Sequence, residues 1–169
     1  MKLAHPRVIA LVAALALAGT ALAWRSANQV ETVPSVSYIL LDGQQGSTDG
    51  LRGKVVLVSF WATSCAACVA EMPQLVATHN QFKDRAYDTL AVAMRYDPPA
   101  YVAHFAASRQ LPFGVAIDNT GEIARRLGDV QLTPTSVLID KHGRIVERYV
   151  GAPDFAALRA RVESLLAET

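Results

Sequence analysis

The sequence predicts an α/β fold, in which helices cover both faces of a mixed central β-sheet. Apolar runs typical of buried strands alternate with helical patterns, and strand–helix–strand units of this kind give parallel strands. Near the C-terminus two strand-like runs are separated by a four-residue turn, which predicts an antiparallel hairpin. The chain has 169 residues, enough for one domain with a full-sized core.

The strands are predicted from their apolar runs, which cover residues 36–41, 54–60, 89–94, 113–117, 135–139 and 144–150. The run at 54–60 is nearly continuous rather than alternating, as is typical of a central strand covered on both faces. Residues 42–47 form a turn cluster after the first strand, and residues 140–143 form the hairpin turn.

The helices are predicted over residues 65–82, 97–109, 121–127 and from 153 to near the C-terminal end. Pro73 lies inside the first of these and is expected to kink it. Asp97 followed by Pro98 is an ordinary start signal for the second helix, and Gly128 is a typical end for the third. In the last helix apolar residues fall on one face at helical spacing.

The first two dozen residues have the pattern of an export signal. Lys2 and Arg7 precede an apolar run over 8–18, and Ala21-Leu22-Ala23 has the small–x–small pattern of a cleavage site. We expect cleavage after Ala23. The alternative is an uncleaved membrane anchor, although the apolar stretch is short against the ~20 residues of a spanning helix.

The chain is therefore expected to consist of a signal peptide at 1–23, a linker at 24–35 and a folded domain at 36–169. The whole chain carries a net charge of +1, and loss of Lys2 and Arg7 with the signal peptide would leave the domain nearly neutral. Such a balance does not indicate nucleic acid as a partner. The domain is expected in the periplasm, either free or tethered to the inner membrane.

The two cysteines of the chain, Cys65 and Cys68, form a C-x-x-C directly behind the central strand and at the start of a predicted helix. A helix N-terminus favours negative charge, so the pKa of Cys65 is expected to fall and Cys65 to be the attacking sulfur. Cys68 lies one turn further in, so it is expected to be less exposed and to resolve the mixed disulfide. Without a third cysteine, the electrons must pass to or from another molecule.

Two other roles for the pair are weaker. Zinc needs four ligands, but there is no second C-x-x-C, and His79, His104 and His142 show no ligand spacing. A structural disulfide across so short a loop would constrain the unfolded chain only weakly. We therefore favour redox chemistry and expect neither a metal nor a cofactor.

A proline stands just before a predicted strand, about seventy residues after the cysteines, in the sequence Leu132-Thr133-Pro134-Thr135. Proline cannot donate a hydrogen bond to a sheet. A cis Thr133–Pro134 bond would present a backbone edge beside the cysteines, where a substrate chain could pair. The alternative is a trans proline that simply opens the strand.

The segment Val58–Cys68, with Glu71-Met72-Pro73, resembles the exported thioredoxin-like family of TlpA/ResA type. Thr133-Pro134-Thr135 and the following hairpin are similar to the cis-proline strand of that family, and the resemblance covers roughly 33–168. It implies a thioredoxin-like fold, a cis Pro134 and an exported thiol–disulfide oxidoreductase. Most members reduce disulfides in cytochrome c maturation or metal-site assembly.

The resemblance also implies partners, namely disulfide-bearing exported proteins and a membrane electron donor that re-reduces the pair; we expect a monomer. Trp61, Ser64 and Thr133 are expected to contact the substrate. The chain departs from the family at Ser64, where Trp is frequent, and at Ala66-Ala67, which lacks the frequent Pro. Ser59 replaces the buried Asp of thioredoxin.

The family resemblance raises the question of a proton acceptor for Cys68. In the ResA-type branch a Glu lies under the cysteines, and by its spacing Asp97 takes that place in this chain. The alternative is that Asp97 only caps the helix opened by Pro98. Glu71 is expected to be a solvated charge.

A rival function is a metallochaperone that delivers copper to an oxidase, because Cu(I) prefers thiolate ligands. Among the histidines late in the chain only His142 could act as a further ligand. The proteins of this kind usually space their cysteines by three residues, which this chain does not.

Overall fold

The computed structural model describes residues 19–20 and 31–168, and the chain divides into two units, Met1–Val30 and Glu31–Thr169. The predicted signal peptide, its cleavage after Ala23 and the first part of the linker lie outside the described residues, apart from Gly19 and Thr20. Of the helices that can be described, none combines the length and the apolar character needed to cross a membrane.

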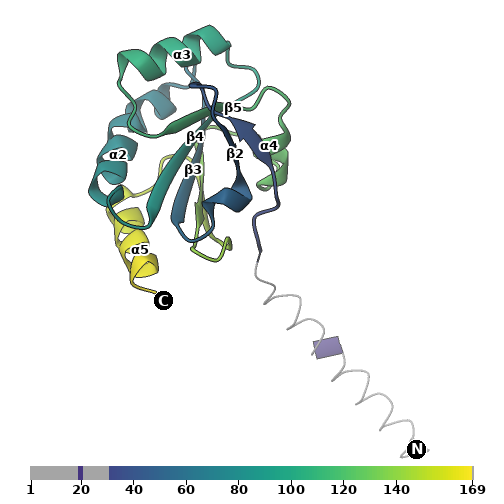
Figure 1. The fold of residues 1–169 in the computed structure, drawn as a ribbon, viewed down its shortest axis with the longest axis vertical. Coiled ribbons are helices and arrows are strands. Elements are labelled where there is room, and N and C mark those ends of the chain that lie inside the picture. The colour runs from purple at the N-terminus through teal and green to yellow at the C-terminus, as the bar shows by residue number, and fades with distance from the viewer. Residues whose placement is uncertain (1–18, 21–30, 169) are drawn as a thin grey trace, which may run out of the picture. The chain divides into compact units, whose positions relative to one another are not determined.

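The second unit is built on a mixed sheet of five strands in the order β5-β4-β3-β6-β7. These strands are β3 (Val55–Trp61), β4 (Tyr87–Ala93), β5 (Gly114–Ile117), β6 (Thr135–Ile139) and β7 (Ile145–Val150). β3, β4 and β5 run parallel, whereas β6 is antiparallel to β3 and β7 to β6. The predicted α/β class and the predicted hairpin are therefore confirmed (Figure 1).

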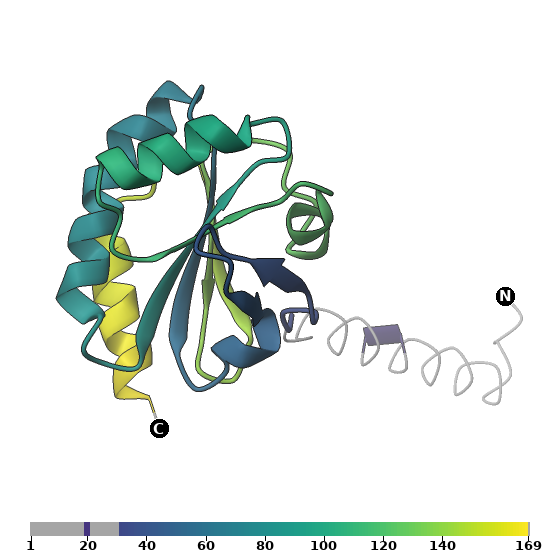
Figure 2. The same cartoon turned by 45° about the horizontal axis from the view of Figure 1, so that its top comes forward.

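Different elements cover the two faces of this sheet (Figure 2). One face carries the helices α2 (Ala66–Phe82), α3 (Pro99–Ser108) and α5 (Phe155–Ala167). The other carries α4 (Glu122–Arg126), the hairpin of β1 (Ser37–Ile39) and β2 (Gln45–Ser47), and the short 3₁₀ helix η1 (Thr48–Leu51).

The central strand β3 explains why its sequence run is continuously apolar. All seven of its residues are buried. Leu57 and Trp61 pack into the cluster under α2, α3 and α5, whereas Val58 and Phe60 pack into the cluster under α4. Each large apolar side chain buried in this way contributes about 1.5–3 kcal/mol. The carboxyl end of this anchored strand carries the cysteines.

The structure differs from the sequence prediction in two segments. Residues 42–47 were expected to be a turn only, but they contain β2, where Gly46 lies against the ring of Tyr38; a Cβ at Gly46 would be 2.4 Å from a ring carbon. The second difference is that α3 begins at Pro99, with Pro98 as its N-cap. The Asp-Pro pair therefore lies before the helix rather than at its start.

Candidate active site

Cys65 and Cys68 follow the carboxyl end of β3 and form a disulfide, with their Cα atoms 5.2 Å apart. Cys65 is the N-cap of α2, and its Sγ accepts a hydrogen bond from the N–H of Cys68 at 3.2 Å. Cys65 is partly exposed, whereas Cys68 is completely buried. The unequal exposure expected from the sequence is present in the structure.

The position of Cys65 favours a negative charge on its sulfur. The first N–H groups of a helix lack partners within the helix, and they point toward the N-cap residue. In the reduced protein the N–H of Cys68 can donate to a thiolate at Cys65, and bonds to charged acceptors are the stronger ones. The buried Cys68 has no such advantage, because burial favours the neutral thiol.

The Thr133–Pro134 bond is cis, as the family resemblance implied. Because Phe60 is opposite Thr135 in the antiparallel register of β3 and β6, Pro134 lies beside the end of β3, where the cysteine loop begins. Pro134 is buried and Thr133 half-buried, while the side chain of Leu132 is 65% exposed. In the described part of the chain, no backbone hydrogen bond outside the regular elements reaches the N–H or C=O of Thr133.

Asp97 holds the loop in front of the cysteines. Its carboxylate accepts hydrogen bonds from the N–H and the Oγ1 of Thr63, both at 2.6 Å, and the residue is only 3% exposed. Thr63 lies two residues before Cys65. α3 has no side-chain cap, so the prediction that Asp97 caps that helix is wrong. The Asp-Pro pair indicated a local helix cap, but the carboxylate of Asp97 instead makes a tertiary contact with Thr63.

The residues next to Asp97 contact both parts of the site. The N–H of Met94 donates to the C=O of Trp61 at the end of β3, at 3.0 Å. The hydroxyl of Tyr96 lies 3.3 Å from the Oγ1 of Thr133. The segment that follows β4 therefore joins the cysteine loop to the cis-proline loop.

Glu71 is the residue that the sequence prediction missed. It is 5% exposed, and neither carboxylate oxygen has a hydrogen-bond partner among the described residues. Burial raises the pKa of this carboxyl to about 7. The expectation of a solvated charge is therefore wrong. Glu71 lies one turn after Cys68 on the buried side of α2, and the helical spacing of Cys68, Glu71 and Leu75 could have shown this.

The three residues expected to contact a substrate are placed differently. Ser64 is exposed and Thr133 half-buried, so both reach the surface. Trp61 is completely buried, with its ring centroid 5.0 Å from that of Phe105. It supports the site from inside the core and is not exposed to a substrate. Ser59 is also buried, opposite Ser136 of β6.

His142 lies at the wrong end of the sheet for a metal site with the cysteines. It is in the turn between β6 and β7, where the neighbouring Lys141 accepts a hydrogen bond from Gly53, just before β3. The cysteines follow the other end of this seven-residue strand, roughly 20 Å away at the usual rise of a strand. Across the described ranges, no group of three or more His, Cys, Asp or Glu side chains is arranged to hold a metal.

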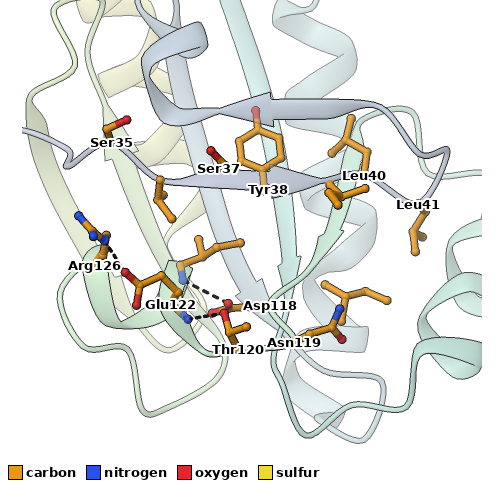
Figure 3. Close-up of a pocket in the computed structure, with 14 residues that line it drawn as sticks. Ser35, Ser37, Tyr38, Leu40, Leu41, Asp118, Asn119, Thr120, Glu122 and Arg126 are labelled. Atoms are coloured by element: carbon orange, nitrogen blue, oxygen red, sulfur yellow. Dashed lines mark hydrogen bonds and ion pairs between the residues drawn. The ribbon is translucent and has the colours of Figure 1, made fainter.

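A pocket of about 680 Å³ lies away from the cysteines, between β1 and the start of α4 (Figure 3). Its charged groups are already satisfied. The carboxylate of Asp118 accepts the N–H groups of two α4 residues, and Glu122 pairs with Arg126. The pocket therefore adds no reactive group to the site.

Asp97→Ala is expected to lower the free energy of unfolding by about 2–4 kcal/mol, because the buried carboxylate is lost and two partly buried donors of Thr63 lose their acceptor. Asp97→Asn should cost less than about 1.5 kcal/mol, since the amide can still accept from the N–H and donate to the hydroxyl. Urea unfolding of the oxidised proteins measures both. Asp154→Ala, which removes the exposed cap of α5, is the matched control. Equal costs for Asp97→Ala and Asp97→Asn would contradict the positioning role.

Glu71→Gln is expected to remove a pH-dependent cost of the folded state. With its pKa raised from 4.5 to about 7, the folded protein keeps a proton that the unfolded chain releases, so stability falls as the pH rises through this window. The loss amounts to about 3 kcal/mol at most. Urea unfolding at about pH 5 and about pH 8 should show this loss of stability in the unmodified protein and not in Glu71→Gln. Glu163→Gln, an exposed carboxylate on α5, should behave like the unmodified protein. A pH-independent difference for Glu71→Gln would refute this account.

Relatives with curated names match the chain along much of its length. The thiol-disulfide oxidoreductase ResA of Bacillus thuringiensis subsp. konkukian is 34% identical over 111 residues, which cover 66% of this chain and 63% of the relative. The protein of the same name from Geobacillus thermodenitrificans is 29% identical over 134 residues, 79% of this chain and 76% of the relative. The chain thus spans somewhat under two thirds of the length of the first of these relatives.

Solved structures share the fold. A Neisseria meningitidis protein described as a thioredoxin is 39% identical, with a TM-score of 0.75 over 81% of this chain and 91% of that protein. A thiol:disulfide interchange protein of the thioredoxin family from Chlorobium tepidum is 25% identical, with a TM-score of 0.75 over 82% and 98%. These likenesses confirm the thioredoxin-like fold and agree with the resemblance to the TlpA/ResA type.

The redoxin family matches residues 29–163, which make up most of the chain and include the cysteine pair, Glu71, Asp97 and the cis-proline loop. The chain belongs to the redoxin family.

Proposed function

We propose that the chain is a thiol–disulfide oxidoreductase whose redox-active pair is Cys65 and Cys68. The observation that carries the proposal is the pairing of a partly exposed sulfur at a helix N-terminus with a buried sulfur one turn further on. Such a pair can be attacked, or can attack, from one side only. The names of the ResA relatives support the same activity.

In the reducing direction the reaction begins with the Cys65 thiolate. It attacks one sulfur of a substrate disulfide, so that a new Cys65–substrate bond forms while the substrate S–S bond breaks. The second substrate sulfur leaves as a thiolate and takes up a proton. Solvent reaches Cys65 but not Cys68, and therefore Cys65 is the sulfur that meets the substrate.

The second step returns the pair to its disulfide. Cys68 loses its proton and attacks the Cys65 sulfur, so the Cys65–Cys68 bond forms while the Cys65–substrate bond breaks, and the substrate sulfur that was bonded to Cys65 leaves and is protonated to a thiol. Two electrons have then passed from the pair to the substrate. Glu71 is suited to take the proton of Cys68, because it lies one turn away and its pKa of about 7 lets it change charge near neutral pH. We assign Asp97 to positioning instead, since its carboxylate already binds Thr63.

The cis-proline loop supplies the place where a substrate chain is held. The N–H and C=O of Thr133 are not used by the backbone bonds of the loop, and they lie beside the end of β3. An extended substrate segment can pair with them as an added strand does. Ser64 and Thr133 then contact that segment, while Pro134 fixes the orientation of the backbone N–H and C=O of Thr133.

We assign the chain to reduction rather than oxidation, and its substrates to disulfide-bearing exported proteins, as in cytochrome c maturation or metal-site assembly. The N-terminal pattern supports export to the periplasm, with a membrane electron donor restoring the thiols and the domain acting as a monomer. The reduction potential, titrated against glutathione, tests the direction. A value near the ~−270 mV of thioredoxin fits a reductant, and one near ~−120 mV an oxidant.

A copper-delivery function receives no support from the geometry. The histidine that this function would use, His142, lies near the amino end of β3, whereas the cysteines follow the carboxyl end of that strand. The thiol pair alone would then have to bind Cu(I).

Cys68→Ser is expected to accumulate mixed disulfides with substrate proteins, because the sulfur that resolves them is missing. Cys65→Ser should trap none, since the remaining Cys68 thiol is buried. Non-reducing gel electrophoresis of each variant, purified from an exporting host, measures the trapped species. The two variants are each other's control, because each keeps one thiol. Trapping by Cys65→Ser instead would reverse the assignment of the nucleophile.

A further inference from the structure

A second pocket, of about 420 Å³, lies beside the cis-proline loop. It is lined by the loop after β4, by the turn that opens α4 and by the residues before Leu132. Ligands of open α/β sheets bind at the carboxyl ends of the strands, and this pocket lies at the carboxyl ends of β4 and β5. The cysteines follow the neighbouring strand β3.

Tyr96 connects this pocket to the redox site. Its side chain lines the pocket and is 56% exposed, while its hydroxyl lies 3.3 Å from the Oγ1 of Thr133. A substrate chain paired with Thr133, as in the proposed function, therefore passes next to Tyr96. The residues that flank the reactive cysteine of that chain are the ones that reach the pocket.

Three of the four charged side chains that line the pocket already have partners. The carboxylate of Asp118 is buried and accepts the N–H groups of Ile123 and Ala124. Arg125 binds the carboxylate of Glu122 at 2.8 Å. Asp129 accepts a hydrogen bond from the side-chain amide of Gln131, also at 2.8 Å. These three side chains therefore bind residues close to them in the sequence.

Arg95 is the fourth, and its guanidinium makes no ion pair or hydrogen bond with any residue that the structure describes. Its side chain lies over the start of α4, where a Cβ at Gly121 would be 3.3 Å from its Cδ. Gly121 has a φ of +74°, a conformation that glycine adopts without strain. The turn thus leaves room for an arginine with five free donors, the geometry that suits a carboxylate.

We propose that this pocket receives an acidic side chain of the substrate polypeptide, close in sequence to its reactive cysteine, and that Arg95 binds the carboxylate. Tyr96 forms the wall between this subsite and the disulfide. The inference rests on the proposed function, because it presumes a polypeptide disulfide bound at Thr133. It makes Arg95 a specificity-determining residue and leaves the chemistry to the cysteines.

The test compares three disulfide-linked peptides that differ only in Glu, Gln or Lys near one cysteine. The second-order rate constant for their reduction by the reduced full chain is measured at low ionic strength. We expect the Glu peptide to react about 3- to 10-fold faster than the Gln peptide, the effect of one partly exposed ion pair. The Lys peptide should be the slowest, and added salt should narrow the differences.

Variants of Arg95 supply the second half of the test. Arg95→Gln should abolish the preference for Glu over Gln, and Arg95→Glu should reverse it in favour of Lys, each preference being the ratio of rate constants within one variant. Arg109→Gln is the matched control, because this exposed arginine stacks on Phe105 at the end of α3 and lies outside the pocket. It should keep the full preference for Glu.

Equal rates for the three peptides, or a Glu preference that survives in Arg95→Gln, would overturn the assignment of the pocket while leaving the oxidoreductase intact. A preference of the unmodified protein for the Lys peptide would also overturn it, because Asp129 rather than Arg95 would then bind the charged side chain of the peptide. Failure to reduce any of the peptides would overturn the proposed function and this inference together.

Discussion

The antiparallel pairing of β6 with β3 is the constraint on which the site depends. It places Thr135 opposite Phe60, so a proline loop about seventy residues further along the chain comes to lie beside the cysteine loop. The register is fixed because β3 is buried on both faces; a slip of one residue would exchange the side chains of the two apolar clusters. The core therefore sets the distance between the cysteines and the cis-proline loop.

The segment after β4 gives this arrangement its precision. Within four residues it bonds to Trp61, Thr63 and Thr133, which belong to the two loops that the register brings together. The neighbouring Arg95 lines the pocket together with Tyr96. One short segment thus positions the cysteine pair and, in our proposal, also binds a side chain of the substrate. In that proposal the sulfurs that react and the arginine that selects the substrate lie close together but are different side chains.

The sequence predicted correctly those elements that depend on patterns within a short stretch of residues. The dithiol, its helix and the strand Thr135–Ile139 were predicted with these positions, because apolar runs and spacing are local signals. The bond between Asp97 and Thr63 spans 34 residues, so a helix cap looked sufficient from the Asp-Pro pair alone. Glu71 is a different case. A charged residue is expected to be solvated, but the helical spacing from Cys68 places Glu71 on the buried side of α2. β2 escaped prediction because a strand of three polar or small residues has no apolar run.

The central claim is that the start of α2 makes Cys65 the reactive thiol. The most direct measurement is the rate of alkylation of each cysteine in the reduced protein as a function of pH, with the modified residue identified by mass spectrometry. The account predicts that Cys65 is modified first, with an apparent pKa clearly below the ~8.5 of a free cysteine, while Cys68 stays protected. Faster modification of Cys68, or a Cys65 that titrates at or above ~8.5, would contradict it.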